Sequence, residues 1–344
     1  MLKEKQDMTA LIVEEEKVRK FAGGLRGDLI TPADAGYEDA RTIYNAMIDK
    51  RPGLIASCEN VADVIASVNF ARQNNLELAI RGGGHNGAGL GLVDDGLVID
   101  LSRMNSVRVD PQARSVRVQG GATWGEVDHT THAFGLAVPS GIISTTGVAG
   151  LTLGGGHGYL SRKYGLTVDN LLEADIVLAD GRLVTASAEE NPDLFWAVRG
   201  GGGNFGVVTS FLFQAHPVNT VYGGPIIWPI DQADKIMRWY RQFIKDAPRD
   251  LYGWFGFHRV PSGSPLPEAL HGKHGCVITW CYTGPMDKAE EVFEPIRALG
   301  TPVLDMAGPM PYPALQSMFD QLYYPPGLQW YWKADFVKEL SDEA

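Results

Sequence analysis

The feature that most constrains this chain is a glycine-rich stretch between Arg81 and Gly91. Six of its eleven residues are glycine, so successive backbone N–H groups can turn toward one small anion and approach it closely. An apolar run at residues 76–80 precedes it and is typical of a buried strand, where ligands often bind at the end. The stretch therefore predicts a phosphate cradle. Its spacing matches neither familiar nucleotide fingerprint, so it does not identify the ligand by itself.

Glycine clusters recur further along the chain, at residues 120–121, 154–158 and 200–206. The intervals between them are unequal, which excludes a solenoid or another regular repeat. Separate loops that all need close backbone approach indicate one extended ligand. A dinucleotide with a pyrophosphate and two ring systems has the appropriate size.

Six motifs in a fixed order carry a family resemblance. They are Arg81-Gly-Gly-Gly-His85, Gly154-Gly-Gly-His-Gly158, Tyr164-Gly-Leu-Thr-Val-Asp-Asn170, Leu178-Ala-Asp-Gly-Arg182, Asn191-Pro-Asp-Leu-Phe-Trp196 and Arg199-Gly-Gly-Gly-Gly-Asn-Phe-Gly-Val-Val-Thr209. The set resembles the FAD-linked oxidases of the berberine-bridge-enzyme type, which belong to the vanillyl-alcohol-oxidase superfamily and have a PCMH-type FAD-binding fold. The resemblance extends over roughly residues 45–336.

The predicted fold is α+β with two domains. We expect an N-terminal helical segment at residues 1–46, a PCMH-type FAD-binding domain at 47–217 and a partial substrate-binding domain at 218–344. In the FAD-binding domain, a strand, a helix that starts after Asn60 and a second strand predict a unit with parallel strands, and Asp180-Gly181 predicts a hairpin turn. In the substrate domain, strands and helices predict an antiparallel sheet covered by helices on one face.

The end of the chain carries two further patterns. Residues 329–336 are predicted as a strand, and residues 341–344 resemble the start of a helix that does not continue. Proteins of the resembled family are longer, so the resemblance implies a C-terminally truncated chain. Their catalytic base lies in the part that has no counterpart here, so no catalytic residue is assigned.

Composition excludes several other functions. A formal net charge of −11 argues against nucleic acid and anionic membrane surfaces as partners. The three cysteines, Cys58, Cys276 and Cys281, are too few for a disulfide scaffold and fit no metal motif. The N-terminus does not resemble a secretory signal, and no run of eighteen apolar residues occurs. These features predict a cytoplasmic protein without a membrane or metal partner.

The resemblance implies covalent FAD, attached through His85 to the 8α-methyl carbon of the isoalloxazine. The alternative is a histidine that donates to a phosphate or to backbone in a glycine turn. His157, in the second Gly-Gly-Gly-His motif, is the rival for attachment, although contact with the flavin edge or a structural role suits it better. Many relatives have a second flavin link through cysteine, but the matching position here is Ile143, so single attachment is expected.

The resemblance also implies which other residues contact FAD. Serine and threonine hydroxyls beside glycines suit hydrogen bonds to phosphate and flavin polar atoms, with an ordinary polar turn as the alternative. Asn204 is expected either to bond a ribose or carbonyl, or only to occupy a left-handed turn. The full expected set is Arg81, Gly82, Gly83, Gly84, His85, Asn86, Gly87, Pro139, Ser140, Gly141, Thr145, Thr146, Gly147, Gly150, Gly155, Gly158, Asp169, Asn170, Gly203, Asn204, Gly206, Val207 and Val208.

The substrate side is less defined. Alternation predicts Trp330 and Trp332 on one face of their strand and Tyr331 and Lys333 on the other. One face of this strand is expected to lie toward the flavin, or else the strand simply belongs to the core of the second sheet. The same two alternatives apply to the predicted strand with Tyr252, Trp254 and His258.

The implied reaction is oxidation of a C–H bond next to OH or N in a small organic molecule, by hydride transfer to flavin and reoxidation by dioxygen. The alternatives are a flavin dehydrogenase with another electron acceptor and an inactive FAD-binding fragment. The sequence does not define the substrate, the acceptor or the oligomeric state.

Overall fold

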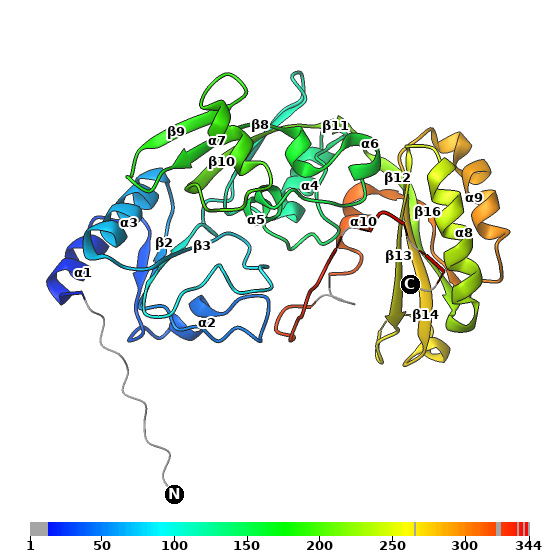
Figure 1. Cartoon of the computed structure of the whole chain (residues 1–344), viewed down its shortest axis with the longest axis horizontal. Coiled ribbons are helices and arrows are strands. Elements are labelled where there is room, and N and C mark those ends of the chain that lie inside the picture. Colours follow the sequence, from blue (N-terminus) through cyan, green and yellow to red (C-terminus); the bar gives the residue numbers. More distant parts are fainter. Residues whose placement is uncertain (1–12, 265, 321–324, 336, 340, 343–344) are drawn as a thin grey trace, which may run out of the picture.

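The computed structural model describes residues 13–264, 266–320, 325–335, 337–339 and 341–342. Figure 1 shows two parts side by side: an N-terminal part built on two sheets, and a C-terminal part in which two long helices lie against one sheet. The fold class is the predicted one, α+β, with an antiparallel sheet covered by helices in the C-terminal part. No helix in the described ranges is long and apolar enough to cross a membrane.

The first sheet confirms the predicted strand–helix–strand unit. Its strand order is β1-β2-β4-β3, and both β2 and β3 run parallel to β4, which lies between them. The helix α3 begins after Asn60, whose side chain accepts the backbone N–H of Asp63 at 3.1 Å. The elements of this region are α1 (Glu15–Ala22), β1 (Asp28–Ile30), α2 (Tyr37–Arg41), β2 (Leu54–Ser57), α3 (Val61–Asn74), β3 (Leu78–Arg81) and β4 (Leu97–Asp100).

The second sheet is antiparallel throughout, with the order β5-β6-β10-β8-β9. The predicted hairpin joins β8 to β9, and Gly181 takes the positive φ of 85° that its turn requires. The elements are β5 (Val107–Asp110), β6 (Ser115–Gln119), α4 (Trp124–His132), β7 (Leu136–Ala137), α5 (Val148–Leu153), α6 (Ser161–Tyr164), a 3-10 turn (Thr167–Asn170), β8 (Leu171–Val177), β9 (Leu183–Ser187), α7 (Pro192–Val198), β10 (Val207–Gln214) and β11 (His216–Pro217).

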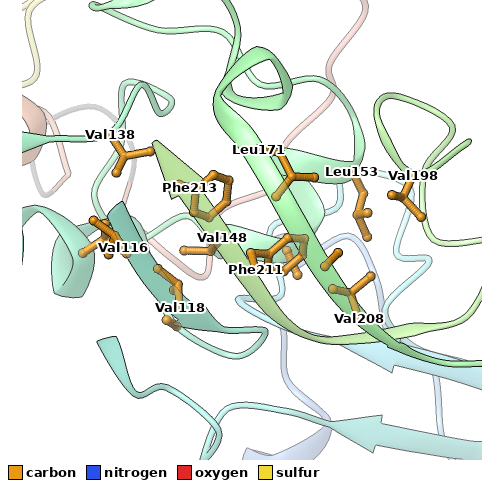
Figure 2. Close-up of a cluster of buried hydrophobic side chains, with 14 of the residues drawn as sticks. Val116, Val118, Val138, Val148, Leu153, Leu171, Val198, Val208, Phe211 and Phe213 are labelled. Atoms are coloured by element: carbon orange, nitrogen blue, oxygen red, sulfur yellow. The ribbon is translucent and has the colours of Figure 1, made fainter. Parts of the chain in front are cut away.

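The core of this part lies against β10. Phe211 and Phe213 point into it from β10, Val116 and Val118 from β6, and Val148 from α5 (Figure 2). Burying such side chains contributes roughly 1.5–3 kcal/mol each. The same packing fixes the start of α5, which follows a predicted cofactor loop.

In the C-terminal part, α8 and α9 cover one face of a sheet ordered β13-β14-β12-β15, as predicted (Figure 1). Trp280 and Phe293 are completely buried between sheet and helices. The elements are β12 (Thr220–Pro229), α8 (Ala233–Asp246), β13 (Leu251–Arg259), β14 (His274–Tyr282), α9 (Ala289–Arg297), β15 (Leu304–Asp305), β16 (Gly308–Pro311), α10 (Tyr312–Ser317) and 3-10 turns at Ile230–Gln232, Glu268–Leu270 and Met286–Lys288.

The predicted strand at residues 329–336 is wrong for its described residues, because 329–335 form no strand. The backbone of Trp330 pairs with the Asn45 side chain instead of with a neighbouring strand. The Asn45 side chain accepts the N–H of Trp330 at 2.9 Å and donates to the carbonyls of Trp330 and Gly87 at 2.9 and 3.0 Å. Trp330 and Trp332 still lie on one side and stack with ring centroids 5.6 Å apart. Ser341 and Asp342 are not helical, while Phe336, Glu343 and Ala344 lie outside the described residues.

Polar contacts join the two parts. Arg162 donates to the carbonyls of Ile244 and Ala247 at the end of α8, at 2.8 and 2.7 Å. The buried amide of Gln316 in α10 donates to Asp128 Oδ2 at 3.2 Å and to Ser140 Oγ at 2.6 Å. Complete burial raises the pKa of Asp128 to about 7, against an ordinary value of 3.8.

Asp128→Asn tests this burial. Between pH 4 and pH 7 the carboxyl of the unfolded chain ionises while the folded one stays neutral, so the wild type loses stability as the pH rises. We expect the difference in free energy of unfolding between Asp128→Asn and the wild type to grow in favour of the variant across this window, by on the order of 4 kcal/mol, and to level off above it. Urea unfolding at pH 4, 5.5 and 7.5 measures the difference. A constant difference at all three values would contradict the prediction. Asp246→Asn, on the exposed end of α8, is the matched control.

Candidate cofactor site

The predicted glycine loops pack against one another without room for a side chain. A Cβ atom on Gly83 would lie 2.4 Å from the backbone N of Gly147, and one on Gly147 would lie 2.3 Å from the N of Gly83. A Cβ atom on Gly82 would lie 3.1 Å from the carbonyl oxygen of Gly120. Three loops from distant parts of the sequence therefore meet at backbone distance.

The first loop offers N–H groups to a ligand. Among the described residues, no protein acceptor is found for the N–H groups of Gly83, Gly84 and His85. Arg81 is different, because its guanidinium is buried, pairs with Asp100 at 2.9 Å and donates to the carbonyl of Ala40 at 2.5 Å. Arg81 thus anchors the loop through its side chain and leaves anion contacts to the backbone that follows.

His85 lies at the centre of the site. Its ring stacks on Tyr44 with centroids 3.9 Å apart, Nε2 lies 3.2 Å from Thr145 Oγ1, and Nδ1 lies 3.4 Å from Thr146 Oγ1. Burial lowers the pKa of His85 to about 4, partly offset by the hydrogen bond to Thr145. The imidazole is therefore neutral near pH 7 and keeps one nitrogen lone pair.

His157 has different neighbours. Its ring lies 5.7 Å from that of Tyr252 and 6.0 Å from that of Trp254, both on β13, and burial lowers its pKa. The two histidines therefore belong to different surroundings: His85 to the glycine loops, and His157 to the face of the C-terminal sheet.

Several predicted residues already have partners in the protein. Ser140 is buried and accepts from Gln316, while Asn170 donates to the carbonyls of Tyr164 and Leu166. Asn204 is not left-handed, and its side chain donates to the carbonyl of Gly201 at 3.2 Å. The contacts of Asp169 are the N–H of Leu166 at 2.8 Å and Arg199 at 3.7 Å.

The remaining predicted residues differ in how much space surrounds them. Gly158 packs against Gly141, and Gly206 takes a φ of 143° where it passes Val177. No atom lies within 4 Å of a Cβ placed on Gly150 or Gly203, so these two face open space. Asn86 is exposed in the first glycine loop, and Gly84 in the same loop has a φ of 71°. The remaining predicted residues are buried or only partly exposed: Gly87, Pro139, Gly155, Val207 and Val208.

A cavity of about 420 Å³ lies between the C-terminal sheet and the loop whose threonines contact His85. Ile142, three residues before Thr145, lines it together with Trp254 and His258 of β13. Most of the lining is apolar or aromatic, and burial lowers the pKa of His258. The other lining residues are Tyr159, Pro225, Ile227, Pro261, Ser262, Gly263, Ser264, Leu266, Val277, Thr279, Met306, Ser317, Met318 and Phe319.

Sequence reasoning did not find Tyr44, Asn45 or Asp320, which the structure brings to the site. Tyr44 stacks on His85, Asn45 holds the glycine loop, and Asp320 contacts Ser144. None of them belongs to a spaced motif, and each acts on residues far away in sequence. In the described part of the chain, no cluster of three or more His, Cys, Asp or Glu side chains is placed to hold a metal ion. Cys58, Cys276 and Cys281 are buried and free.

Comparison with known proteins identifies the family. Residues 52–187 match the model of an FAD-binding domain. An FAD-linked oxidoreductase of Dictyostelium discoideum is 34% identical over 325 residues, which cover 94% of this chain and 68% of that protein. The chain belongs to the FAD-linked oxidoreductases. This confirms the predicted family. The predicted resemblance to berberine-bridge-type oxidases is also confirmed, because the similar solved structures include a berberine-bridge-like protein.

Two solved structures are similar to this FAD-linked oxidoreductase chain. The crystal structure of 6-hydroxy-D-nicotine oxidase from Arthrobacter nicotinovorans has a TM-score of 0.80 and 32% identity, covering 88% of this chain and 66% of that one. A berberine-bridge-like protein of Physcomitrella patens has a TM-score of 0.74 and 28% identity, covering 83% and 61%. The chain thus spans about two thirds of the length of the relatives it matches.

The site fits FAD on its own geometry. The glycine contacts allow backbone to reach a pyrophosphate, and N–H groups without an internal acceptor supply the donors that an anion needs. Open space beside Gly150 and Gly203 leaves room for the rest of an extended ligand.

Replacing Gly83 tests the close contact. A Cβ at 2.4 Å from backbone forces the loops apart, so we expect Gly83→Ala to destabilise the protein by about 1–3 kcal/mol, measured by thermal unfolding. Gly150→Ala is the matched control: it meets open space in α5, where alanine is favoured over glycine by about 1 kcal/mol. We expect Gly150→Ala to be as stable as the wild type or up to about 1 kcal/mol more stable. We also expect it to retain less FAD, because its methyl group projects into the open space. Equal stability of the two variants would contradict the prediction.

Proposed function

We propose that this chain binds FAD across its glycine loops and that His85 attaches it covalently. The observation that carries the proposal is the position of His85: a neutral imidazole at the end of the phosphate-binding loop, held between Tyr44 and two threonine hydroxyls. A neutral imidazole nitrogen is the nucleophile that such a bond needs. Ile143 in place of the second attachment cysteine supports a single bond.

We propose domain limits at 47–217 for FAD binding and 218–344 for the substrate, with residues 1–46 preceding them. Three core clusters draw only on residues before 216, and the buried residues of a fourth lie within 222–299, which supports a boundary near 217. A fifth cluster, which includes Ala137, Tyr159 and Leu315, packs the two domains against each other. Phe21 and Tyr37 pack in the cores of the first domain, so the N-terminal segment folds together with it.

The proposed activity is oxidation of a C–H bond next to OH or N in a small organic molecule. Bound FAD would accept the hydride and pass two electrons to dioxygen, while a base takes the accompanying proton. The cavity of about 420 Å³ suits a small, largely apolar substrate, and Trp254 and His258 would orient it from β13. The structural relative named for 6-hydroxy-D-nicotine oxidation supports an amine as one substrate class. A dehydrogenase with another acceptor is the alternative.

Acid precipitation tests the attachment. The chain is expressed with FAD and precipitated with trichloroacetic acid, and flavin absorbance is measured in the pellet. We expect yellow colour in the wild type and in His157→Ala, and a colourless pellet in His85→Ala. Colour that persists in His85→Ala would disprove attachment at His85. A soluble but colourless wild type would contradict the whole proposal and favour an inactive form of the chain.

Anaerobic reduction tests the activity. Protein carrying flavin is mixed with a panel of secondary amines, alcohols and sugars, and bleaching of the flavin absorbance is followed before and after air is admitted. Recovery in air supports an oxidase, whereas recovery only with an added dye supports a dehydrogenase. No bleaching with any compound would contradict the proposed reaction for this panel.

A further inference from the structure

A buried carboxylate from the C-terminal half contacts the turn that holds His85. Asp320 is 8% exposed and follows α10. Its Oδ1 accepts the N–H of Ser144 at 3.0 Å, and the hydroxyl of Ser144 donates to its Oδ2. On the other side, the carbonyl of Ser144 accepts the N–H of Gly125 at 2.7 Å. All three polar groups of Ser144 are therefore fixed.

The two residues that follow Ser144 hold the imidazole through their hydroxyls. The turn that carries them is tight: the N–H of Thr146 donates to the carbonyl of Ile143 at 3.3 Å, and the carbonyl of Thr146 accepts the N–H of Trp124 at 2.9 Å. The next residue, Gly147, contacts Gly83 at backbone distance. A shift of Ser144 must therefore move both threonine hydroxyls relative to His85.

We propose that Asp320 is a positioning residue for His85, acting through Ser144 and the threonine hydroxyls to fix the orientation of the imidazole. The inference deepens the proposed function and rests on it for the role of His85. It means that the ring is correctly oriented only when α10 lies against the first half of the chain. Gln316, one turn before Asp320, holds α10 there through Ser140.

The orientation matters because one nitrogen of His85 must point at the methyl carbon. In the proposed bond, the methyl carbon would lose one hydrogen and the imidazole its N–H proton as the C–N bond forms. The flavin would keep the two electrons until dioxygen, the proposed acceptor, takes them together with two protons. A loose imidazole reaches the required alignment less often, so attachment slows although the nucleophile is still present.

The first experiment needs no cofactor. The imidazole titration of His85 is followed by 1H–15N NMR in the full chain without flavin, with His85→Gln used to assign the signals. Asp320→Ala should free the turn and expose the ring, so the pKa of His85 should rise from about 4 toward the ordinary 6.5. Ser144→Ala keeps its N–H contact with Asp320 and should raise the pKa part of the way. Asp320→Asn should keep most of the depression, because its amide oxygen still accepts from Ser144. Asp246→Ala, an exposed Asp→Ala control on α8, should leave the titration unchanged.

The second experiment measures the rate at which flavin becomes acid-stable after FAD is added to each variant. We expect at least a tenfold slower attachment in Asp320→Ala, intermediate rates in Ser144→Ala and Asp320→Asn, and a near wild-type rate in Asp246→Ala. Circular dichroism and thermal unfolding verify that each variant is folded. Ser144→Ala removes only one hydroxyl and keeps the amide, so it provides a test if Asp320→Ala does not fold.

Unchanged titration of His85 in whichever of Asp320→Ala and Ser144→Ala is folded, together with an unchanged rate of attachment, would overturn the inference. If the wild type attaches no flavin, the proposed function fails, yet the NMR titration still decides whether Asp320 positions the ring. If the rate falls without a change in the titration, the effect does not pass through the imidazole, and the inference is also wrong.

Discussion

The backbone contact between Gly83 and Gly147 is the constraint on which the rest of the site depends. It joins the loop after a parallel strand of the first sheet to the loop that begins α5 in the second part of the core. Because glycine carries no Cβ atom, the two backbones can pack in direct contact, and both loops then lie at the same candidate site. His85 and the two threonines reach each other only because of this approach. The cofactor geometry is therefore a consequence of how two sheets are packed.

The C-terminal half completes this arrangement through buried polar groups. Asn45, which is 1% exposed, both donates to and accepts from the segment around Trp330 and also donates to Gly87. Two donated bonds and an accepted one at a single position need an amide, because a hydroxyl has only one donor and a carboxylate has none. Gln316 in α10 only donates to the first half of the chain, and Asp320, just after α10, only accepts from it. Removing one partner from such a buried pair leaves the other unsatisfied, at a cost of about 1–3 kcal/mol, so the halves are held in a specific arrangement.

Local patterns predicted most of the long elements. The Asn60 cap and the Asp180-Gly181 turn each depend on chemistry within a few residues, and both are present. Short elements such as β1, β5 and α10 were missed because three to six residues carry too little periodicity. The strand predicted near Trp330 had the right alternation. Its hydrogen bonds go to the Asn45 side chain instead of a neighbouring strand, and alternation alone cannot show that choice.

By itself, the sequence determined that the chain belongs with FAD-linked oxidoreductases, and it predicted that glycine loops serve an extended phosphate-bearing ligand and that His85 is the residue to examine. These conclusions need only residue type and spacing, because close backbone approach requires glycine wherever it occurs. The tertiary structure decided what surrounds His85: the stacking on Tyr44, the two threonine contacts and the clamp of Asp320 on Ser144. Those contacts join residues separated by 41 to 176 positions, and only the packing of the sheets and α10 brings them within hydrogen-bonding distance.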